Sequence, residues 1–241
     1  MRGLIAAFGL LSRIPLPRSM QAGEGDLDAA GAWFPLVGLT LGALSWIAAA
    51  SLSLLGADPW VGALALILLW LAFTGGLHLD GAADLADALG AAHRDPTRLQ
   101  AVLKDPHIGS FGATALATIL LTRLVASHAL IDDGGTSAAW LWIPAWARLG
   151  ALFWARTLPP LTDGSAARLA TPGRGQPAIW CWTALLGPLS WWTVSPDFAV
   201  AALLAPAAWW LFLRRRLAGM NGDALGAGIE CVECLLLLAA G

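Results

Sequence analysis

The sequence predicts an all-α, polytopic helical membrane protein with about seven transmembrane helices. Of the 241 residues, 58% are hydrophobic and only 12% are charged, whereas a soluble globular protein carries about 25% charged residues. The chain also holds 14 tryptophans and no tyrosine, and indole rings concentrate at membrane interfaces. These observations exclude an ordinary soluble domain.

Seven apolar segments are long enough, or nearly so, to cross a bilayer core of about 30 Å, which takes roughly 20 helical residues. They lie at 29–55, 60–77, 110–131, 138–157, 178–194, 198–213 and 224–240. Pro188 and Pro206 are expected to kink the fifth and sixth of them. No internal repeat or low-complexity linker divides the chain, so we expect a single integral membrane domain over 1–241.

Basic residues fall in alternate segments between the predicted spans. The N-terminal segment and those after the second, fourth and sixth spans hold the Lys and Arg, whereas the other connections hold only acids. Those acids are Asp58, Asp132, Asp133 and Asp197. By the positive-inside rule, the basic side is cytoplasmic. We therefore expect a multi-pass membrane protein, with the N-terminus and the polar stretch after the second span in the cytoplasm and the C-terminus outside.

The most polar stretch of the chain runs from Gly75 to Gly112. Within it Asp80, Asp84 and Asp87 stand at i, i+4 and i+7, which puts three carboxylates on one face of a helix. These carboxylates repel one another unless a cation lies between them. A solvated helix face is the alternative, and the surrounding Ala, Leu and Gly residues disfavour it. Because oxygen ligands suit Mg²⁺ or Mn²⁺, the spacing predicts a divalent-metal site that faces the cytoplasm.

A turn at Lys104–Ser110 closes this stretch. Its proline and glycine favour a turn, and Ser110 is expected to cap the helix of the third span. A lysine, a histidine and a helix N-terminus together can bind phosphate. An ordinary helix connection would explain the proline, glycine and serine, but not Lys104, Asp105 and His107. The residues alone leave both interpretations open.

Acidic residues also enter the last predicted span. Asp223 lies at its cytoplasmic end and is expected to bind metal or substrate. Glu230 and Glu233 lie deeper, where a charge exposed to lipid costs about 2.5 kcal/mol or more. Arg148 in the fourth span is the first candidate for their counter-charge, and Arg123 in the third is another. A structural ion pair and a functional role both stay open for the two glutamates.

From the residues alone, the sequence predicts a membrane enzyme with an acidic, divalent-metal site for phosphate-containing substrates. An ion- or proton-coupled transporter is the alternative from another class, with the buried Glu and Arg residues as a relay. A transporter predicts charges at mid-depth in several spans and inverted repeats. The charges here crowd the cytoplasmic side instead, which favours the enzyme.

Three segments resemble the cobalamin synthase family, adenosylcobinamide-GDP ribazoletransferase: GGLHLDGAADLADALGA, KDPHIGSFG and NGDALGAGIECVE. The opening FGLLSRIPLP and the acidic GDLDAAGAWFPLVGLTLGAL are similar to the same family, so the resemblance covers essentially the whole chain in order. Two departures are the C-x-x-C around Glu233 and Ala88, where many members have glycine. A CDP-alcohol phosphotransferase is disfavoured, since Leu77 stands where its motif needs an aspartate and Ala83-Asp84 where it needs Ala-Arg.

The resemblance implies that adenosylcobinamide-GDP and alpha-ribazole give adenosylcobalamin and GMP with Mg²⁺; alpha-ribazole 5'-phosphate is the other acceptor it allows. The metal ligands expected on this basis are Asp80, Asp84, Asp87 and Asp223. The catalytic residues are Lys104, which stabilises phosphate charge, and Asp105 or His107, which takes the hydroxyl proton or orients the acceptor. The substrate-binding residues are His78, Arg94, Ser110, Asn221 and Arg148.

The resemblance also implies a location in the bacterial inner membrane. The expected partners are these two substrates and the lipid bilayer, and nucleic acid is not expected. Other enzymes of the cobalamin pathway, or a second copy of this chain, stay open as partners.

Overall fold

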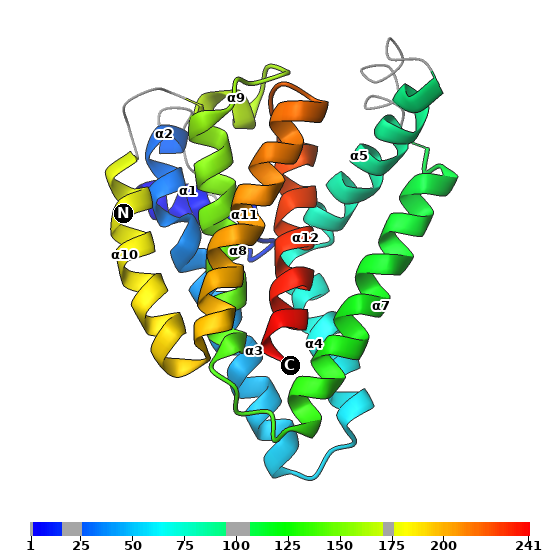
Figure 1. The fold of residues 1–241 in the computed structure, drawn as a ribbon, viewed down its shortest axis with the longest axis vertical. Coiled ribbons are helices and arrows are strands. Elements are labelled where there is room, and N and C mark those ends of the chain that lie inside the picture. Colours follow the sequence, from blue (N-terminus) through cyan, green and yellow to red (C-terminus); the bar gives the residue numbers. More distant parts are fainter. Residues whose placement is uncertain (1, 16–25, 95–106, 171–175) are drawn as a thin grey trace.

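The computed structural model describes residues 2–15, 26–94, 107–170 and 176–241, and the regular elements in these ranges are helices. In chain order they are α1 (Arg2–Leu11), α2 (Leu27–Ala30), the 3-10 turn η3 (Gly31–Trp33), α3 (Phe34–Leu54), α4 (Pro59–Thr74), α5 (Leu77–Arg94), α7 (Ser110–Asp132), α8 (Ala139–Thr157), α9 (Ser165–Leu169), α10 (Gln176–Thr193), α11 (Pro196–Arg216) and α12 (Gly222–Ala240). Figure 1 shows them as one bundle. The all-α prediction is confirmed.

A helix forms at each of the seven predicted positions, namely α3, α4, α7, α8, α10, α11 and α12. By length and apolar composition, three stretches in the described residues can cross a membrane: Leu27–Leu54, Ser110–Asp132 and Pro196–Arg216. A fourth is added if Pro59–Thr74 and Leu77–Ala91, which are bent by 89°, count as one span. The fold thus contains three to four candidate spans, and the count of seven stays a prediction.

The core of the bundle is organised around α8, which is buried along almost its whole length. It packs lengthwise on α3 and also against α12, α10 and α11. The indoles of Trp140 and Trp154 are fully buried on it, and Trp154 donates to the carbonyl of Pro206 in α11 at 2.8 Å. Large aromatic side chains thus fix α8 against its neighbours.

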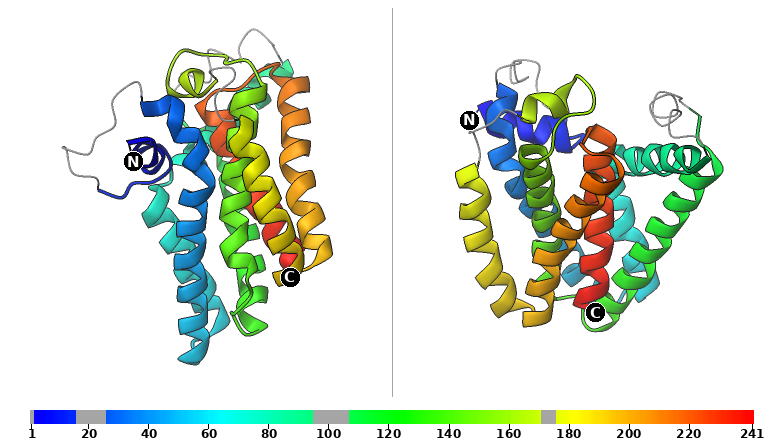
Figure 2. Two further views of the ribbon diagram at one scale, coloured as in Figure 1. Left: turned by 90° about the vertical axis from the view of Figure 1, so that its left-hand side faces the viewer. Right: turned by 45° about the horizontal axis from the view of Figure 1, so that its top comes forward.

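The chain turns sharply between α4 and α5, and this turn places the acidic helix. Gly75 and Gly76 have φ values of 63° and 72°, a left-handed conformation that glycine adopts without steric cost. As a result α5 leaves α4 at 89° and runs outward across the upper part of the bundle (Figure 2, right). Because of this bend, α5 does not continue α4 as one straight helix. Its acidic face meets the beginning of α12 instead.

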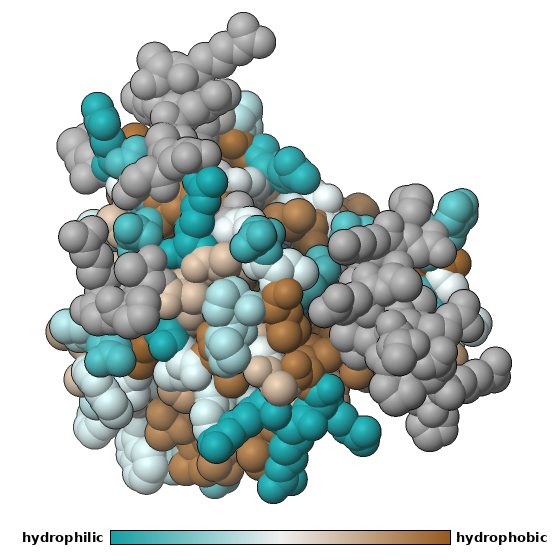
Figure 3. Space-filling view, turned by 90° about the horizontal axis from the view of Figure 1, so that it is seen from above, coloured by the Kyte–Doolittle hydropathy of each residue, from teal (hydrophilic) through white to brown (hydrophobic). Residues whose placement is uncertain are grey.

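The two ends of the bundle differ in polarity. The connections from α3 to α4, from α7 to α8 and from α10 to α11 all lie at the lower end in Figure 1, and the acids Asp58, Asp132 and Asp197 lie in or directly beside them. The exposed arginines Arg214, Arg215 and Arg216 form the last turn of α11 at the opposite end. Hydrophilic side chains gather on this upper face (Figure 3). The charge alternation in the sequence therefore corresponds to two ends of one folded bundle.

Much of the outer surface between these ends is apolar. Leu204, Leu121 and Leu68, in the middle of α11, α7 and α4, are 62%, 61% and 56% exposed. Monomeric soluble proteins seldom expose large apolar patches. This surface agrees with a protein surrounded by lipid.

A buried ionic cluster ties α12 to α7 and α8. The guanidinium of Arg123 donates to Glu230 at 2.7 Å and also to Glu233, while Arg148 donates to the other oxygen of Glu233. Arg123 also stacks 4.0 Å above the ring centre of Trp70. The predicted counter-charges are confirmed, because each glutamate has a cationic partner inside the bundle.

Loss of Glu233 is expected to destabilise the bundle more than loss of Glu230. Glu233→Ala removes the carboxylate that Arg148 and Arg123 share, and breaking a buried pair costs about 3–5 kcal/mol. Glu230→Ala leaves Arg123 paired with Glu233, so the fall should be smaller. Thermal unfolding in detergent, followed by circular dichroism, measures the difference. Cys231→Ala on the same helix is the control, and equal falls for the two glutamate variants would contradict the assignment.

Candidate active site

The site is built where α5 crosses α12 at very short range. A Cβ added to Gly81 of α5 would lie 2.9 Å from the Cα of Asp223, and one added to Gly226 of α12 would lie 3.2 Å from the Cα of His78. Real Cβ atoms do not come as close as the first of these contacts. Glycine at position 81 lets the two backbones touch, and a Cβ at position 226 would require a neighbour to move by a few tenths of an ångström. The contact brings a motif from the middle of the chain beside a motif from its end.

Three predicted metal ligands face one another across this contact. Burial raises the pKa of Asp84, and the charges of Asp80 and Asp87 raise it further. Burial also raises the pKa of Asp223, as do Asp84 and Asp80 from the other helix, while a hydrogen bond from Asn221 lowers it. Carboxylates that raise one another's pKa form a site where a cation relieves repulsion.

The fourth predicted ligand, Asp87, has a structural partner. Its two oxygens accept hydrogen bonds from the backbone N–H groups of Gly109, at 2.7 Å, and Gly112, at 2.9 Å. A carboxylate in this position caps α7 and interacts favourably with the helix dipole. The prediction that Ser110 caps this helix is wrong: α7 begins at Ser110 itself, and the capping oxygens come from α5, distant in sequence.

Asn221 holds the beginning of α12 and orients the carboxylate next to it. Its side-chain oxygen accepts from the N–H of Ala224 at 2.9 Å, and its amide nitrogen donates to Asp223 at 2.9 Å. The residue is 5% exposed. Its observed contacts are therefore those of a helix cap that also positions Asp223.

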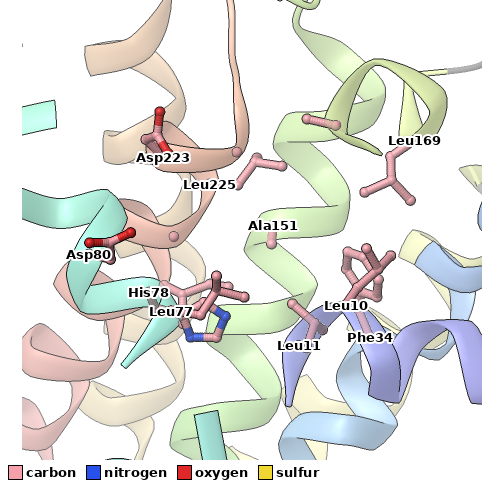
Figure 4. Close-up of a pocket in the computed structure, with 14 residues that line it drawn as sticks. Leu10, Leu11, Phe34, Leu77, His78, Asp80, Ala151, Leu169, Asp223 and Leu225 are labelled. Atoms are coloured by element: carbon pink, nitrogen blue, oxygen red, sulfur yellow. The ribbon is translucent and has the colours of Figure 1, made fainter. Parts of the chain in front are cut away.

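His78 and Asp80 line a pocket beside this contact (Figure 4). The pocket has a volume of about 260 Å³. Its walls come from α1, α3, α5, α8, α9 and α12, and Asp223 lies with Asp80 on one side of it. The acidic cluster thus adjoins a cavity of a size suited to part of a small ligand.

The other predicted residues lie at different depths. His107 and Ser110 are exposed near the start of α7, on the turn held by Asp87. Arg148 is fully buried in the ionic cluster, so its contacts in the structure are with Glu233 and its own helix. Lys104 and Asp105 lie outside the described residues, and so does the side chain of Arg94. Their predicted roles stay predictions.

The acidic cluster has the donor atoms that a hard divalent cation prefers, but its described side chains are not already arranged around a metal position. Asp80, Asp84 and Asp223 offer carboxylate oxygens, which Mg²⁺ prefers. Across the parts of the chain that the structure describes, no group of three His, Cys, Asp or Glu side chains already stands in a metal-binding arrangement. Mg²⁺ is usually held by one or two carboxylates together with substrate phosphates and water, and the cluster meets that requirement.

Sequence reasoning missed the residues that shape this site. Gly81 and Gly226 were visible only as parts of motifs, although a glycine inside a helix can mark a close approach of another backbone. The apolar pocket wall from Leu10, Leu11 and Leu169 carries no sequence signal, because leucines in a membrane protein are ordinary. Their role depends on tertiary packing alone.

The family model described as cobalamin-5-phosphate synthase matches residues 3–241. The chain belongs to this family. A curated relative from Thiobacillus denitrificans, named adenosylcobinamide-GDP ribazoletransferase, is 46% identical over all of this chain and 95% of its own length. A relative of the same name from Laribacter hongkongensis is 49% identical over 100% of this chain and 96% of its own length. Another, from Corynebacterium efficiens, is 32% identical over 95% of this chain and 86% of its own length. No solved structure gave a match.

Membership of the cobalamin-5-phosphate synthase family confirms the resemblance seen in the sequence motifs. The family match spans both α5 and α12. The segments that carried the resemblance therefore include the two helices that meet at Gly81 and Asp223.

Separating α5 from α12 is expected to reduce activity without unfolding the protein. Gly81→Ala places a Cβ against the backbone at Asp223, so the helices must move apart, and a displacement of about 1 Å at a site can cost 100-fold in rate. The measurement is steady-state turnover together with helix content by circular dichroism. Gly187→Ala in α10 is the matched control, since its Cβ would meet nothing within 4 Å. Full activity of Gly81→Ala would show that the contact does not position the site.

Proposed function

We propose that this protein is an adenosylcobinamide-GDP ribazoletransferase that catalyses the final step of cobalamin biosynthesis. Family membership over residues 3–241 and relatives of that name at 46% and 49% identity support the activity. The structural observation that carries the proposal is the acidic cluster from α5 and α12 at the edge of a pocket. A pyrophosphate substrate with a divalent cation fits such a cluster.

The reaction exchanges one bond to phosphorus for another. The ribazole hydroxyl oxygen forms a bond to the phosphorus on the cobinamide side of the pyrophosphate. The bond from that phosphorus to the bridging oxygen breaks, and the bridging oxygen leaves on GMP. The hydroxyl proton passes to a base, so that adenosylcobalamin, GMP and one proton are formed. With alpha-ribazole 5'-phosphate as acceptor the product is adenosylcobalamin 5'-phosphate.

The acidic residues are proposed to hold the cation that balances the negative charge of the pyrophosphate. Asp80, Asp84 and Asp223 would hold Mg²⁺, and Asp87 would join them or keep the turn at Gly109 in place. Bound Mg²⁺ neutralises charge on the phosphate oxygens. Asn221 keeps the Asp223 carboxylate oriented.

The segment Lys104–Ser110, predicted as a turn from the sequence, is proposed to supply the remaining groups. Lys104 would stabilise charge on the phosphates, and Asp105 or His107 would accept the hydroxyl proton or orient the acceptor. The Asp87 hydrogen bonds to Gly109 and Gly112 support this arrangement, because they hold the end of the turn against α5. Arg94 and Ser110 are proposed as phosphate-binding groups along the same edge.

The basic end of the bundle is proposed to face the cytoplasm of a bacterium, with all seven long helices crossing the inner membrane. The alternation of basic and acidic connections supports this orientation. It places the acidic cluster on the side where nucleotide substrates occur. Purification from the membrane tests whether a second copy of this chain or other enzymes of the cobalamin pathway accompany the enzyme.

Purified protein is expected to release GMP from adenosylcobinamide-GDP only when alpha-ribazole and Mg²⁺ are both present. Chromatographic detection of GMP is the measurement, and omission of each component is the control. Asp80→Asn should lower the rate by about 100-fold or more, because one charge-balancing group is lost. The matched variant Asp197→Asn changes an exposed acid at the start of α11 and should keep the wild-type rate. No GMP from the wild-type protein with all components would contradict the proposed function.

A further inference from the structure

The pocket beside the acidic cluster is apolar except on one side. Leu10, Leu11, Phe34, Leu169 and Ile229 contribute to its wall. Among the described residues, the polar side chains that line it are those of His78, Asp80 and Asp223. In Figure 4 the two carboxylates lie on one side of the cavity, and the imidazole of His78 lies below them. A ligand that fills this pocket needs one polar end and an apolar body with few polar atoms.

His78 supplies the polar group that the rest of the fold does not use. Its side chain is 3% exposed, and among the described residues neither ring nitrogen has a hydrogen-bond partner. Buried polar groups are nearly always hydrogen-bonded in proteins. An imidazole that is buried, unpartnered and part of a pocket wall therefore points to a ligand with a complementary atom.

We propose that this pocket binds the ribazole acceptor, with its aromatic base in the apolar part against His78 and its ribose toward Asp80 and Asp223. This assignment rests on the proposed function, since it names the part of the site that receives one of the two substrates. Ribazole is a ribonucleoside of a dimethyl-substituted benzimidazole. Its base is a flat, largely apolar bicycle with one unsubstituted ring nitrogen, which accepts a hydrogen bond.

The pocket wall distinguishes this base from the other parts of the two substrates. Guanine carries an amide and an amino group, and most of these polar atoms would be left without partners against leucine and phenylalanine. The corrin macrocycle is too large for a cavity of about 260 Å³. The dimethylbenzimidazole base has one free acceptor, and the neutral His78 imidazole has one N–H to donate. The acceptor of the base thus pairs with the N–H of His78, and the second ring nitrogen of His78 gains no partner from the base.

The same placement puts the reacting end where the proposed chemistry occurs. With the base in the apolar part, the ribose extends toward the two carboxylates on the other side of the pocket (Figure 4). Its hydroxyl then lies beside the cluster proposed to hold the pyrophosphate. His78 acts here as a positioning residue, because it fixes the base and takes no part in bond making.

Binding of alpha-ribazole to the purified full-length protein, without the corrinoid, tests the assignment by calorimetry. The comparison ligand is the indole nucleoside, in which a C–H group replaces the unsubstituted ring nitrogen. The wild-type protein should bind the indole nucleoside about tenfold more weakly, because one hydrogen bond to a buried group is lost. His78→Leu should bind both ligands equally and alpha-ribazole about tenfold more weakly than the wild type does.

A second variant keeps the test independent of how well His78→Leu folds. Ala166→Leu fills the pocket from α9, where the residue is only partly buried. It should raise the KM for alpha-ribazole at least tenfold and leave the KM for adenosylcobinamide-GDP within about twofold. Ala207→Leu, an exposed position on a separate cavity between α8, α10 and α11, is the control and should change neither KM.

The possible failures are distinguishable. If the wild-type protein releases GMP but binds the indole nucleoside as tightly as alpha-ribazole, the subsite is wrong and the proposed function stands. If Ala166→Leu raises the KM for the corrinoid in place of that for alpha-ribazole, the pocket belongs to the other substrate. Binding of alpha-ribazole with the expected selectivity but no GMP release would overturn the proposed function and support the subsite.

Discussion

The close contact between α5 and α12 is the constraint on which the site depends. Gly81 lies against the backbone at Asp223, and Gly226 lies against the backbone at His78, so a single interface fixes the carboxylates of both helices and one wall of the pocket. The left-handed turn at Gly75 and Gly76 makes this contact possible, because it directs α5 across the bundle. Charge repulsion among the aspartates opposes the contact, and the packing of the glycines holds it together.

The ionic cluster fixes α12 deeper along the same face that meets α5, because Gly226, Glu230 and Glu233 follow one another at helical spacing. Glu230 and Glu233 lie on α12 beyond Gly226 and bind Arg123 of α7 and Arg148 of α8. In a low-dielectric interior a paired charge has few alternative partners, so these bonds specify the rotation and depth of the helix more than they add to stability. Asp223, at the start of the same helix, is thereby held toward α5. The buried charges are thus explained by a structural role, and no transport pathway is needed to account for them.

The sequence predicted the positions of the long helices well, because apolar length and charge alternation are local signals. It also predicted the partners of Glu233, since a buried carboxylate needs a cation and few were present. It failed at Ser110, where local capping rules gave way to Asp87, a tertiary partner from α5. The pocket around His78 was not predictable, because its wall is made of leucines from α1 and α9 whose meeting depends on packing between distant segments.

The most direct test of the account is whether both helices contribute to one cation site. Electron paramagnetic resonance of Mn²⁺ added to the purified protein counts bound ions and gives their Kd without any substrate. The account predicts that Asp80→Asn on α5 and Asp223→Asn on α12 each weaken Mn²⁺ binding at least tenfold, while Asp197→Asn leaves it unchanged. Wild-type affinity for Mn²⁺ in the Asp223→Asn protein would contradict a site shared between α5 and α12.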